Sequence, residues 1–139
     1  MSEIIIEAGP YTFGARLEIE DAPETCRAFL AAMPFESQFV HVRWSGEGVW
    51  VPLGDRDFGV GYENHTSHPA PGQVLLYPGG ISETEIVLAY GGLDFSTKMG
   101  QIAGNHFVTI HTGLENLRKL GELVLWKGAQ DVKFSLRAS

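Results

Sequence analysis

The 139-residue sequence contains a single cysteine, Cys26, so an internal disulfide is excluded. It has no apolar run long enough to cross a bilayer, and no basic amino-terminal segment followed by a long apolar one. We therefore expect neither a transmembrane helix nor a signal peptide. A lone cysteine is also more usual in reducing compartments, and together these absences predict a cytoplasmic protein.

Basic residues are scarce: 10 Lys and Arg stand against 17 Asp and Glu, for a net charge of -7. The densest basic group is the pair Arg118-Lys119. Nucleic acids and anionic membrane surfaces are bound by clustered Lys and Arg, so we expect neither as a partner. Hydrophobic residues make up 44% and charged residues 19%, which predicts one globular domain spanning residues 1–139.

Motifs for several common kinds of chemistry are missing as well. The sequence has no phosphate-binding glycine motif, and Ser45 lies in Trp-Ser-Gly-Glu-Gly, which is not a nucleophile elbow. His65 and His68 have a His-x-x-His spacing, but a third metal ligand at a suitable spacing is absent. We therefore expect no metal and no cofactor.

Short apolar segments bounded by turn residues, several of them alternating with period two, predict about eight short strands. We place them at 4–20 (two strands around the turn Gly9-Pro10), 37–44, 49–53, 73–77, 84–90, 106–111, 122–126 and 131–136. Many short strands with two short helices are typical of a mainly β protein, and we predict a closed β-barrel capped by helices at its open ends.

The two helices are predicted from their end signals. The first has Asp21 as a cap, Pro23 in its first turn, an apolar stripe through Cys26 and Phe29, and a stop at Pro34. The second follows the strand at 106–111. Thr112 and Glu115 have the spacing of a capping box, an apolar stripe follows, and Gly121 is the expected helix stop.

Several segments resemble cyclophilins. They are Ala-Pro-Glu-Thr-Cys-Arg-Ala-Phe-Leu at 22–30, Val-His-Val-Arg-Trp at 40–44, Pro-Gly-Gln-Val-Leu-Leu-Tyr at 71–77 and Gly-Asn-His-Phe-Val at 104–108. The order of predicted elements is also similar. The sequence resembles small bacterial cyclophilin-like proteins of uncharacterised function more closely, from about Phe13 to Phe134. The resemblance implies a cyclophilin-like barrel.

The resemblance also implies roles for two residues. Arg43 matches the arginine that hydrogen-bonds the carbonyl before proline, and His106 matches the histidine beside the proline pocket. Other parts of the cyclophilin pattern are missing. Trp44 to Gly48 follow Arg43 in place of the Phe-x-x-Gln-Gly-Gly-Asp segment, and the loop before His106, at Gln101 to Ala103, contains no Trp. Prolyl isomerisation uses an apolar pocket together with an arginine donor, and only the donor is visible in the sequence.

Arg43 and His106 are thus the candidate catalytic residues, each with a plainer alternative. As a site residue, Arg43 would donate hydrogen bonds to a carboxylate or an amide carbonyl of a ligand. In the plainer alternative it lies at the barrel rim and forms an ion pair with Glu47 or Glu85. As a site residue, His106 would form the polar rim of a pocket together with Asn105. In the plainer alternative it is a surface histidine whose hydrogen bonds are made within the protein. The expected ligand-binding residues beside them are Phe39, His41, Glu47, Glu85, Tyr90 and Asn105.

Glu83 and Glu85 share one face of a predicted strand. Paired carboxylates can act in acid–base chemistry, but we favour a solvated barrel exterior for them, because the apolar face of this strand is the one through Ile86 and Leu88.

Three functions follow. The first is a binding module that holds a small amide, a carboxylate or a peptide segment between Arg43 and Asn105-His106. The second is a divergent prolyl isomerase. The third is an enzyme for a small amide, with Glu47 or Glu85 and His106 as acid–base groups. A homo-oligomer is also considered, because Trp44, Trp50 and Trp126 suit a contact surface.

Overall fold

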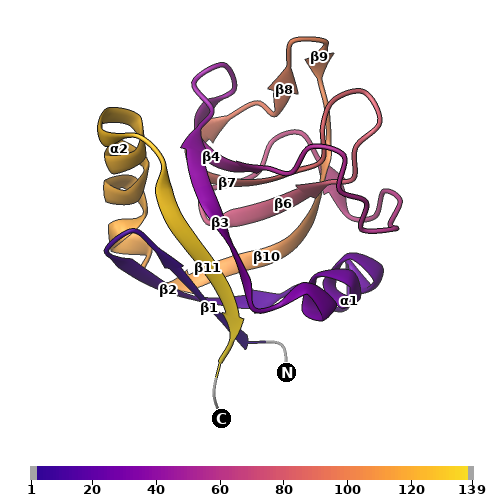
Figure 1. Ribbon diagram of the computed structural model, residues 1–139, viewed down its shortest axis with the longest axis horizontal. Coiled ribbons are helices and arrows are strands. Elements are labelled where there is room, and N and C mark those ends of the chain that lie inside the picture. The colour runs from indigo at the N-terminus through magenta and orange to yellow at the C-terminus, as the bar shows by residue number, and fades with distance from the viewer. Residues whose placement is uncertain (1–2, 138–139) are drawn as a thin grey trace.

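The computed structural model describes residues 3–137, which form a closed antiparallel β-barrel with two helices packed against it (Figure 1). In hydrogen-bonding order its eight strands are β2 (Tyr11–Leu17), β1 (Glu3–Ala8), β11 (Gln130–Leu136), β3 (Phe35–His41), β4 (Gly46–Pro52), β7 (Glu85–Leu93), β6 (Gln73–Tyr77) and β10 (Gly104–Thr112). Pairing of β10 with β2 closes the barrel, and the short strand β5 (His65–Thr66) adds to β10. The predicted mainly β barrel is confirmed.

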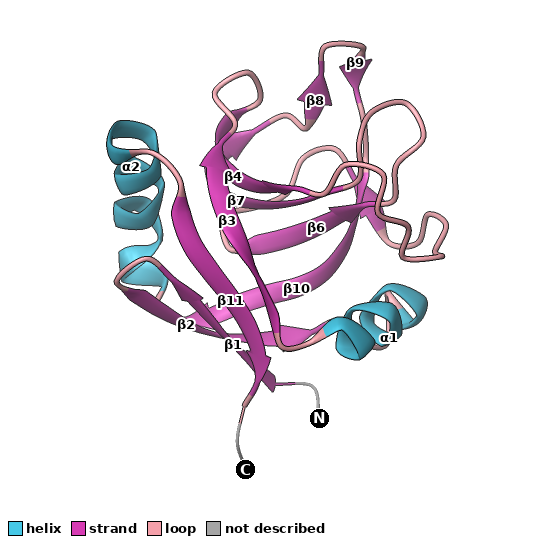
Figure 2. Cartoon of the chain, viewed as in Figure 1, coloured by secondary structure: helices cyan, strands magenta, loops and turns pink. Residues whose placement is uncertain are grey.

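The helices α1 (Pro23–Ala32) and α2 (Leu117–Lys127) lie on opposite sides of the barrel (Figure 2). A 3₁₀ helix, η1 (Leu114–Asn116), precedes α2. The predicted stripe of the first helix is buried, and the Phe29 ring lies 5.1 Å from that of Phe107 and 5.2 Å from that of Phe134 between centroids. Burial of these rings anchors α1 to the barrel interior.

Three predictions about helix ends were wrong. Neither Asp21 nor Thr112 makes a capping hydrogen bond, since Ala22 and Gly113 occupy the cap positions. Gly121 does not end a helix: it lies inside α2, and residues 122–126 are helical rather than a strand. A Cβ at Gly121 would collide with the ring of Tyr90, so this glycine permits close helix–strand packing instead of a stop.

The strands also differ from the alternation pattern in places. β3 ends at His41, so Arg43 lies in the turn to β4 and not on a strand face. β7 continues through Gly91-Gly92 to Leu93. A bulge in β10 buries both Phe107 and Val108, which places His106 and Thr109 on the same side of the strand.

A second apolar layer covers the outside of the barrel over β4, β6 and β7. It consists of Val42, Leu75, Tyr77, Val87, Ala89, Leu93, Phe95 and Ile102, with Trp50 packed against it. Phe95 and Ile102 come from segment 94–103, which carries the hairpin of β8 (Ser96–Thr97) and β9 (Gly100–Gln101). The hairpin is thereby held at the barrel end marked by β4 and β7 (Figure 1).

Candidate functional site

A hollow of about 650 Å³ lies between the β8–β9 hairpin and the outer side of β4 and β7. It is lined by Trp44, Trp50, Ser82, Glu83, Glu85, Ser96, Thr97, Lys98 and Met99. Aromatic and aliphatic walls around a few polar groups are the usual composition of a small-molecule site. We call it the hairpin hollow.

Hydrogen bonds fix two borders of the hairpin hollow. The indole nitrogen of Trp44 donates to the carbonyl of Ser96 at 3.1 Å, and the Ser45 hydroxyl accepts from the Ser96 amide at 3.2 Å. Across the hollow, the hydroxyl oxygen of Tyr77 accepts from the amides of Ile81 and Ser82. The turn before β4 is therefore bonded to the β8–β9 hairpin, and the turn before β7 is bonded to β6.

Glu85 is the buried carboxyl of this site. The residue is 4% exposed, and within residues 3–137 its carboxyl forms no hydrogen bond or ion pair. Burial, reinforced by the charge of Glu83, raises the pKa of Glu85 from its ordinary value of 4.5 to about 8. At neutral pH the carboxyl holds its proton, so it can both donate and accept a hydrogen bond.

The expectation that Glu85 lies on a solvated exterior was wrong. Its cross-strand neighbours are Tyr77 on β6 and Pro52 on β4, and Tyr77 is fully buried beneath Phe95. The outer face of β7 is therefore covered by the second apolar layer, while Glu83 is exposed at the mouth of the hollow.

Two tryptophans form the aromatic wall. The rings of Trp44 and Trp50 lie 5.5 Å apart between centroids at an interplanar angle of 88°. Trp44 is 56% exposed, whereas the indole nitrogen of Trp50 is buried and has no hydrogen-bond partner among the described residues. A large exposed aromatic beside an unused donor is typical of a surface prepared for contact.

Phe39 does not line a pocket. It is completely buried inside the barrel, with its ring 6.3 Å from that of Phe134. This prediction was wrong because β3 turns Phe39 inward, towards the core.

Four predicted residues, His41, Arg43, Glu47 and Tyr90, gather instead at the barrel end covered by α2. The His41 Nε2 atom lies 2.6 Å from the Tyr90 hydroxyl. Burial lowers the pKa of His41, and the charge of nearby Arg43 lowers it further. Arg43 is exposed.

The partner of Glu47 is Arg118, and not Arg43. The Arg118 guanidinium makes two hydrogen bonds to the Glu47 carboxylate, at 3.0 and 3.1 Å, and lies over the Tyr90 ring at 5.3 Å from its centroid. Those hydrogen bonds, with one from the Gly92 amide, lower the pKa of Glu47. The pair holds α2 against β4 and β7.

Asn105 is fully buried and fully hydrogen-bonded. Its oxygen accepts from the Glu63 amide at 3.1 Å, and its nitrogen donates to the Thr25 hydroxyl at 3.1 Å and the Gly61 carbonyl at 2.9 Å. Glu63 in turn accepts from the amide and hydroxyl of Thr25. This network holds the loop before β5 against α1, which explains Asn105 without a ligand.

His106 belongs to a separate surface group. Its Nε2 atom lies 2.7 Å from the Thr109 hydroxyl, which donates its single proton to Glu18. Thr109 therefore accepts from an Nε2 proton of His106, which fixes the tautomer of the ring. Burial lowers the pKa of His106, and the charge of Glu18 offsets part of that effect.

Arg43 and His106 lie apart in the sheet. β10 is separated from β4 by β6 and β7, and the second apolar layer fills the outer surface over those strands. Glu85 and His106 are separated by β6 in the same way.

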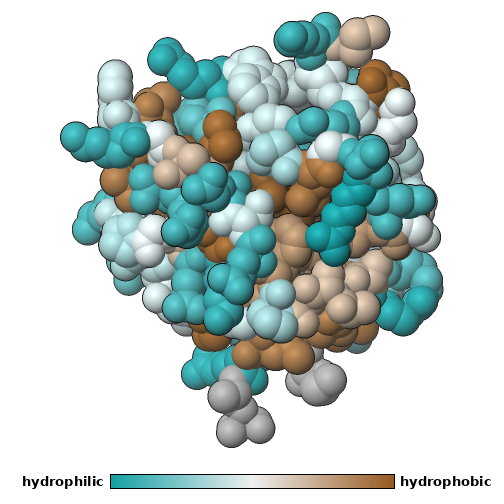
Figure 3. All heavy atoms as spheres, viewed as in Figure 1, coloured by the Kyte–Doolittle hydropathy of each residue, from teal (hydrophilic) through white to brown (hydrophobic). Residues whose placement is uncertain are grey.

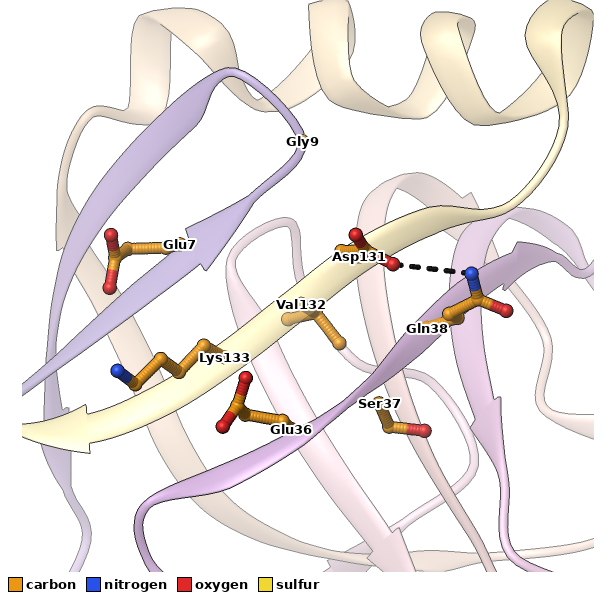
Figure 4. Close-up of a pocket in the computed structure, with 8 residues that line it drawn as sticks. All are labelled: Glu7, Gly9, Glu36, Ser37, Gln38, Asp131, Val132 and Lys133. Atoms are coloured by element: carbon orange, nitrogen blue, oxygen red, sulfur yellow. Dashed lines mark hydrogen bonds between the residues drawn. The ribbon is translucent and has the colours of Figure 1, made fainter.

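A polar groove on the outer surface of β1, β11 and β3 offers weaker chemistry. Figure 4 shows Lys133 between Glu7 and Glu36, with a hydrogen bond from Gln38 to Asp131 of 3.2 Å. Hydrophilic side chains cover much of this face in Figure 3. These charges compensate one another across neighbouring strands, which is ordinary for a solvated sheet surface.

Trp44, Trp50 and Met99 were not predicted from the sequence as site residues. The available signal was two tryptophans on either side of a glycine-rich turn, but their common neighbour, the β8–β9 hairpin, could not be inferred from local pattern. Within residues 3–137, no three His, Cys, Asp or Glu side chains are grouped to hold a metal ion, and no helix is long and apolar enough to cross a membrane.

Residues 4–136 match a protein family of unknown function, DUF3830. The chain belongs to this family. No curated protein matches it.

Three solved structures resemble this DUF3830 protein. McbB, solved in complex with tryptophan, has a TM-score of 0.74 and 18% identity over 98% of this chain, which spans 45% of McbB. The hypothetical protein AF2241 from Archaeoglobus fulgidus has a TM-score of 0.63 and 20% identity, over 98% of this chain and 95% of its own. A cyclophilin-type peptidyl-prolyl cis-trans isomerase of Cryptosporidium parvum, solved in the presence of Ala-Pro, has a TM-score of 0.67 and 12% identity, over 99% of both chains. The cyclophilin-like fold is thus confirmed.

Proposed function

We propose that this DUF3830 protein binds a small organic molecule in the hairpin hollow. The ligand has a flat or aliphatic body that lies against Trp44 and Trp50, and a hydrogen-bonding head that reaches Glu85. The observation that carries the proposal is Glu85, a residue 4% exposed overall, whose carboxyl has no partner among the described residues and lines a largely apolar hollow. A buried polar group without a partner is unfavourable, and a ligand that supplies the partner removes that penalty.

The fold offers precedents for ligand binding. McbB was solved in complex with tryptophan, and the Cryptosporidium parvum isomerase in the presence of a dipeptide. The hairpin hollow of about 650 Å³ is within the range of small-molecule pockets. We favour this site over the pocket between Arg43 and Asn105-His106 expected from sequence, because Asn105 is already hydrogen-bonded and the other two residues lie on separate elements.

Thermal shift with a panel of small aryl and alkyl amines, amides and acids tests the proposal. We expect at least one class to raise the melting temperature. Trp44→Ala should abolish most of that shift, because Trp44 is an exposed wall of the hollow. The matched control is Trp126→Ala, which removes a 73% exposed tryptophan from α2 and should leave the shift intact. Equal effects of the two changes, or no shift with any compound, would reject the proposal.

Prolyl isomerisation is the alternative that the cyclophilin-like fold raises. It requires an apolar pocket beside the arginine donor, and the outer surface between Arg43 and His106 is filled by Phe95 and Ile102. We expect an X-Pro peptide to isomerise at its uncatalysed rate, over tens of seconds, in the presence of the protein. A clear acceleration that is lost in Arg43→Ala would favour the isomerase.

A further inference from the structure

We infer that the ligand of the hairpin hollow carries a cationic head, a primary or secondary ammonium, which forms an ion pair with Glu85 and lies against the faces of Trp44 and Trp50. This inference rests on the proposed binding function and specifies the chemical class of the ligand.

The charges around the hairpin hollow favour a cation. Glu83 and Glu85 line it, with Lys98 as the one basic side chain among its lining residues. An adjoining hollow shares Ser82 and Glu83 and adds Asp55, Arg56 and Asp57.

Arg56 is engaged elsewhere, because its guanidinium lies over the rings of Phe35 and Phe58 at 5.4 and 4.7 Å from their centroids. With Glu85 protonated, the carboxylates of this region are Glu83 at the hairpin hollow and Asp55 and Asp57 at the adjoining hollow, against one exposed lysine and one stacked arginine. A carboxylate ligand would meet like charge here, whereas an ammonium would meet opposite charge.

Glu85 distinguishes this arrangement from an ordinary acidic surface. The residue is 4% exposed overall, and within the described chain its carboxyl has no partner. Its neighbours on the flanking strands are uncharged, Pro52 on β4 and Tyr77 on β6. The charged groups that line the same hollow are Glu83, in the turn before β7, and Lys98, between β8 and β9. Burial and Glu83 keep the carboxyl protonated at neutral pH, so an ammonium that enters takes the place of the proton.

The aromatic wall suits the same head group. The planes of the Trp44 and Trp50 rings lie at 88° to each other, so the two rings form the walls of a nearly right-angled corner. A tryptophan face attracts a cation through its quadrupole, and more strongly where water is excluded. An ammonium in this corner gains an ion pair and a cation–π contact together, which a neutral amide does not.

Three probes on one aromatic body test the inference: tryptamine, indole-3-acetamide and indole-3-acetate, which are cationic, neutral and anionic. Isothermal titration at pH 7 should give the tightest binding with tryptamine and the weakest with indole-3-acetate. The dissociation constant for tryptamine should fall about 50-fold from pH 6 to pH 8, because Glu85 loses its proton over that range while an alkylammonium stays charged. Titration in phosphate and Tris should show release of a proton on binding.

Glu85→Gln should remove both the pH dependence and the preference for the cation, while Glu115→Gln, a change of an exposed carboxylate on η1, should keep both. Tighter binding of indole-3-acetamide than of tryptamine, or a pH-independent tryptamine affinity, would overturn the cationic head but leave ligand binding in place. If none of the three probes binds, the cationic head group and the proposed binding function would both be rejected for ligands with an indole body.

Discussion

Replacement of Glu85 by glutamine should change how the stability of this protein depends on pH. Between pH 4.5 and about 8 the folded protein holds a proton on Glu85 that the unfolded chain has released, because burial raises the folded pKa from 4.5 to about 8. The unfolding free energy therefore falls as pH rises through this window, by up to about 1.4 kcal/mol per pH unit. Glutamine has nearly the same shape and does not titrate, so Glu85→Gln removes this slope.

The expected size follows from the two pKa values. From pH 5 to pH 8, wild type should lose about 3.5 kcal/mol relative to Glu85→Gln. Urea unfolding of both proteins at several pH values measures the difference directly. Glu115→Gln is the control and should run parallel to wild type. Parallel curves for Glu85→Gln and wild type would refute the burial argument and weaken both proposals for the hairpin hollow.

Two further changes test the packing and the electrostatics beneath α2. Gly121→Ala should destabilise the protein by about 1–3 kcal/mol, although alanine favours helix, because its methyl group meets the Tyr90 ring. Arg43→Ala should raise the pKa of His41, followed by NMR titration, because the positive charge of Arg43 holds that pKa down.

Each change has a matched control. Gly61→Ala adds a methyl group where no atom lies within 4 Å, and should alter stability by less than about 0.5 kcal/mol. If Gly121→Ala were instead stabilising, as at an exposed helix position, the close contact with Tyr90 would be wrong. Lys98→Ala removes a positive charge from the hairpin hollow and should leave the His41 titration unchanged; an equal rise would mean that the effect is not local.

Local pattern was enough for most of the barrel. The segment 73–77 was predicted as a strand at the observed bounds of β6. The first helix followed from the stripe through Cys26 and Phe29. Resemblance to cyclophilins in four short segments predicted how these elements assemble, and it predicted the fold correctly.

The tertiary structure decided what local pattern leaves open, namely which neighbour each residue meets. Gly121 has the same sequence signal as a helix stop, and only the approach of Tyr90 makes it an interior packing position. Glu85 was named from sequence, but its burial depends on segment 94–103 folding back, with Phe95 and Ile102, over the outer face of β6 and β7. Burial and charge act through space, so the pKa of a carboxyl and the walls of a hollow are set by contacts between distant parts of the chain.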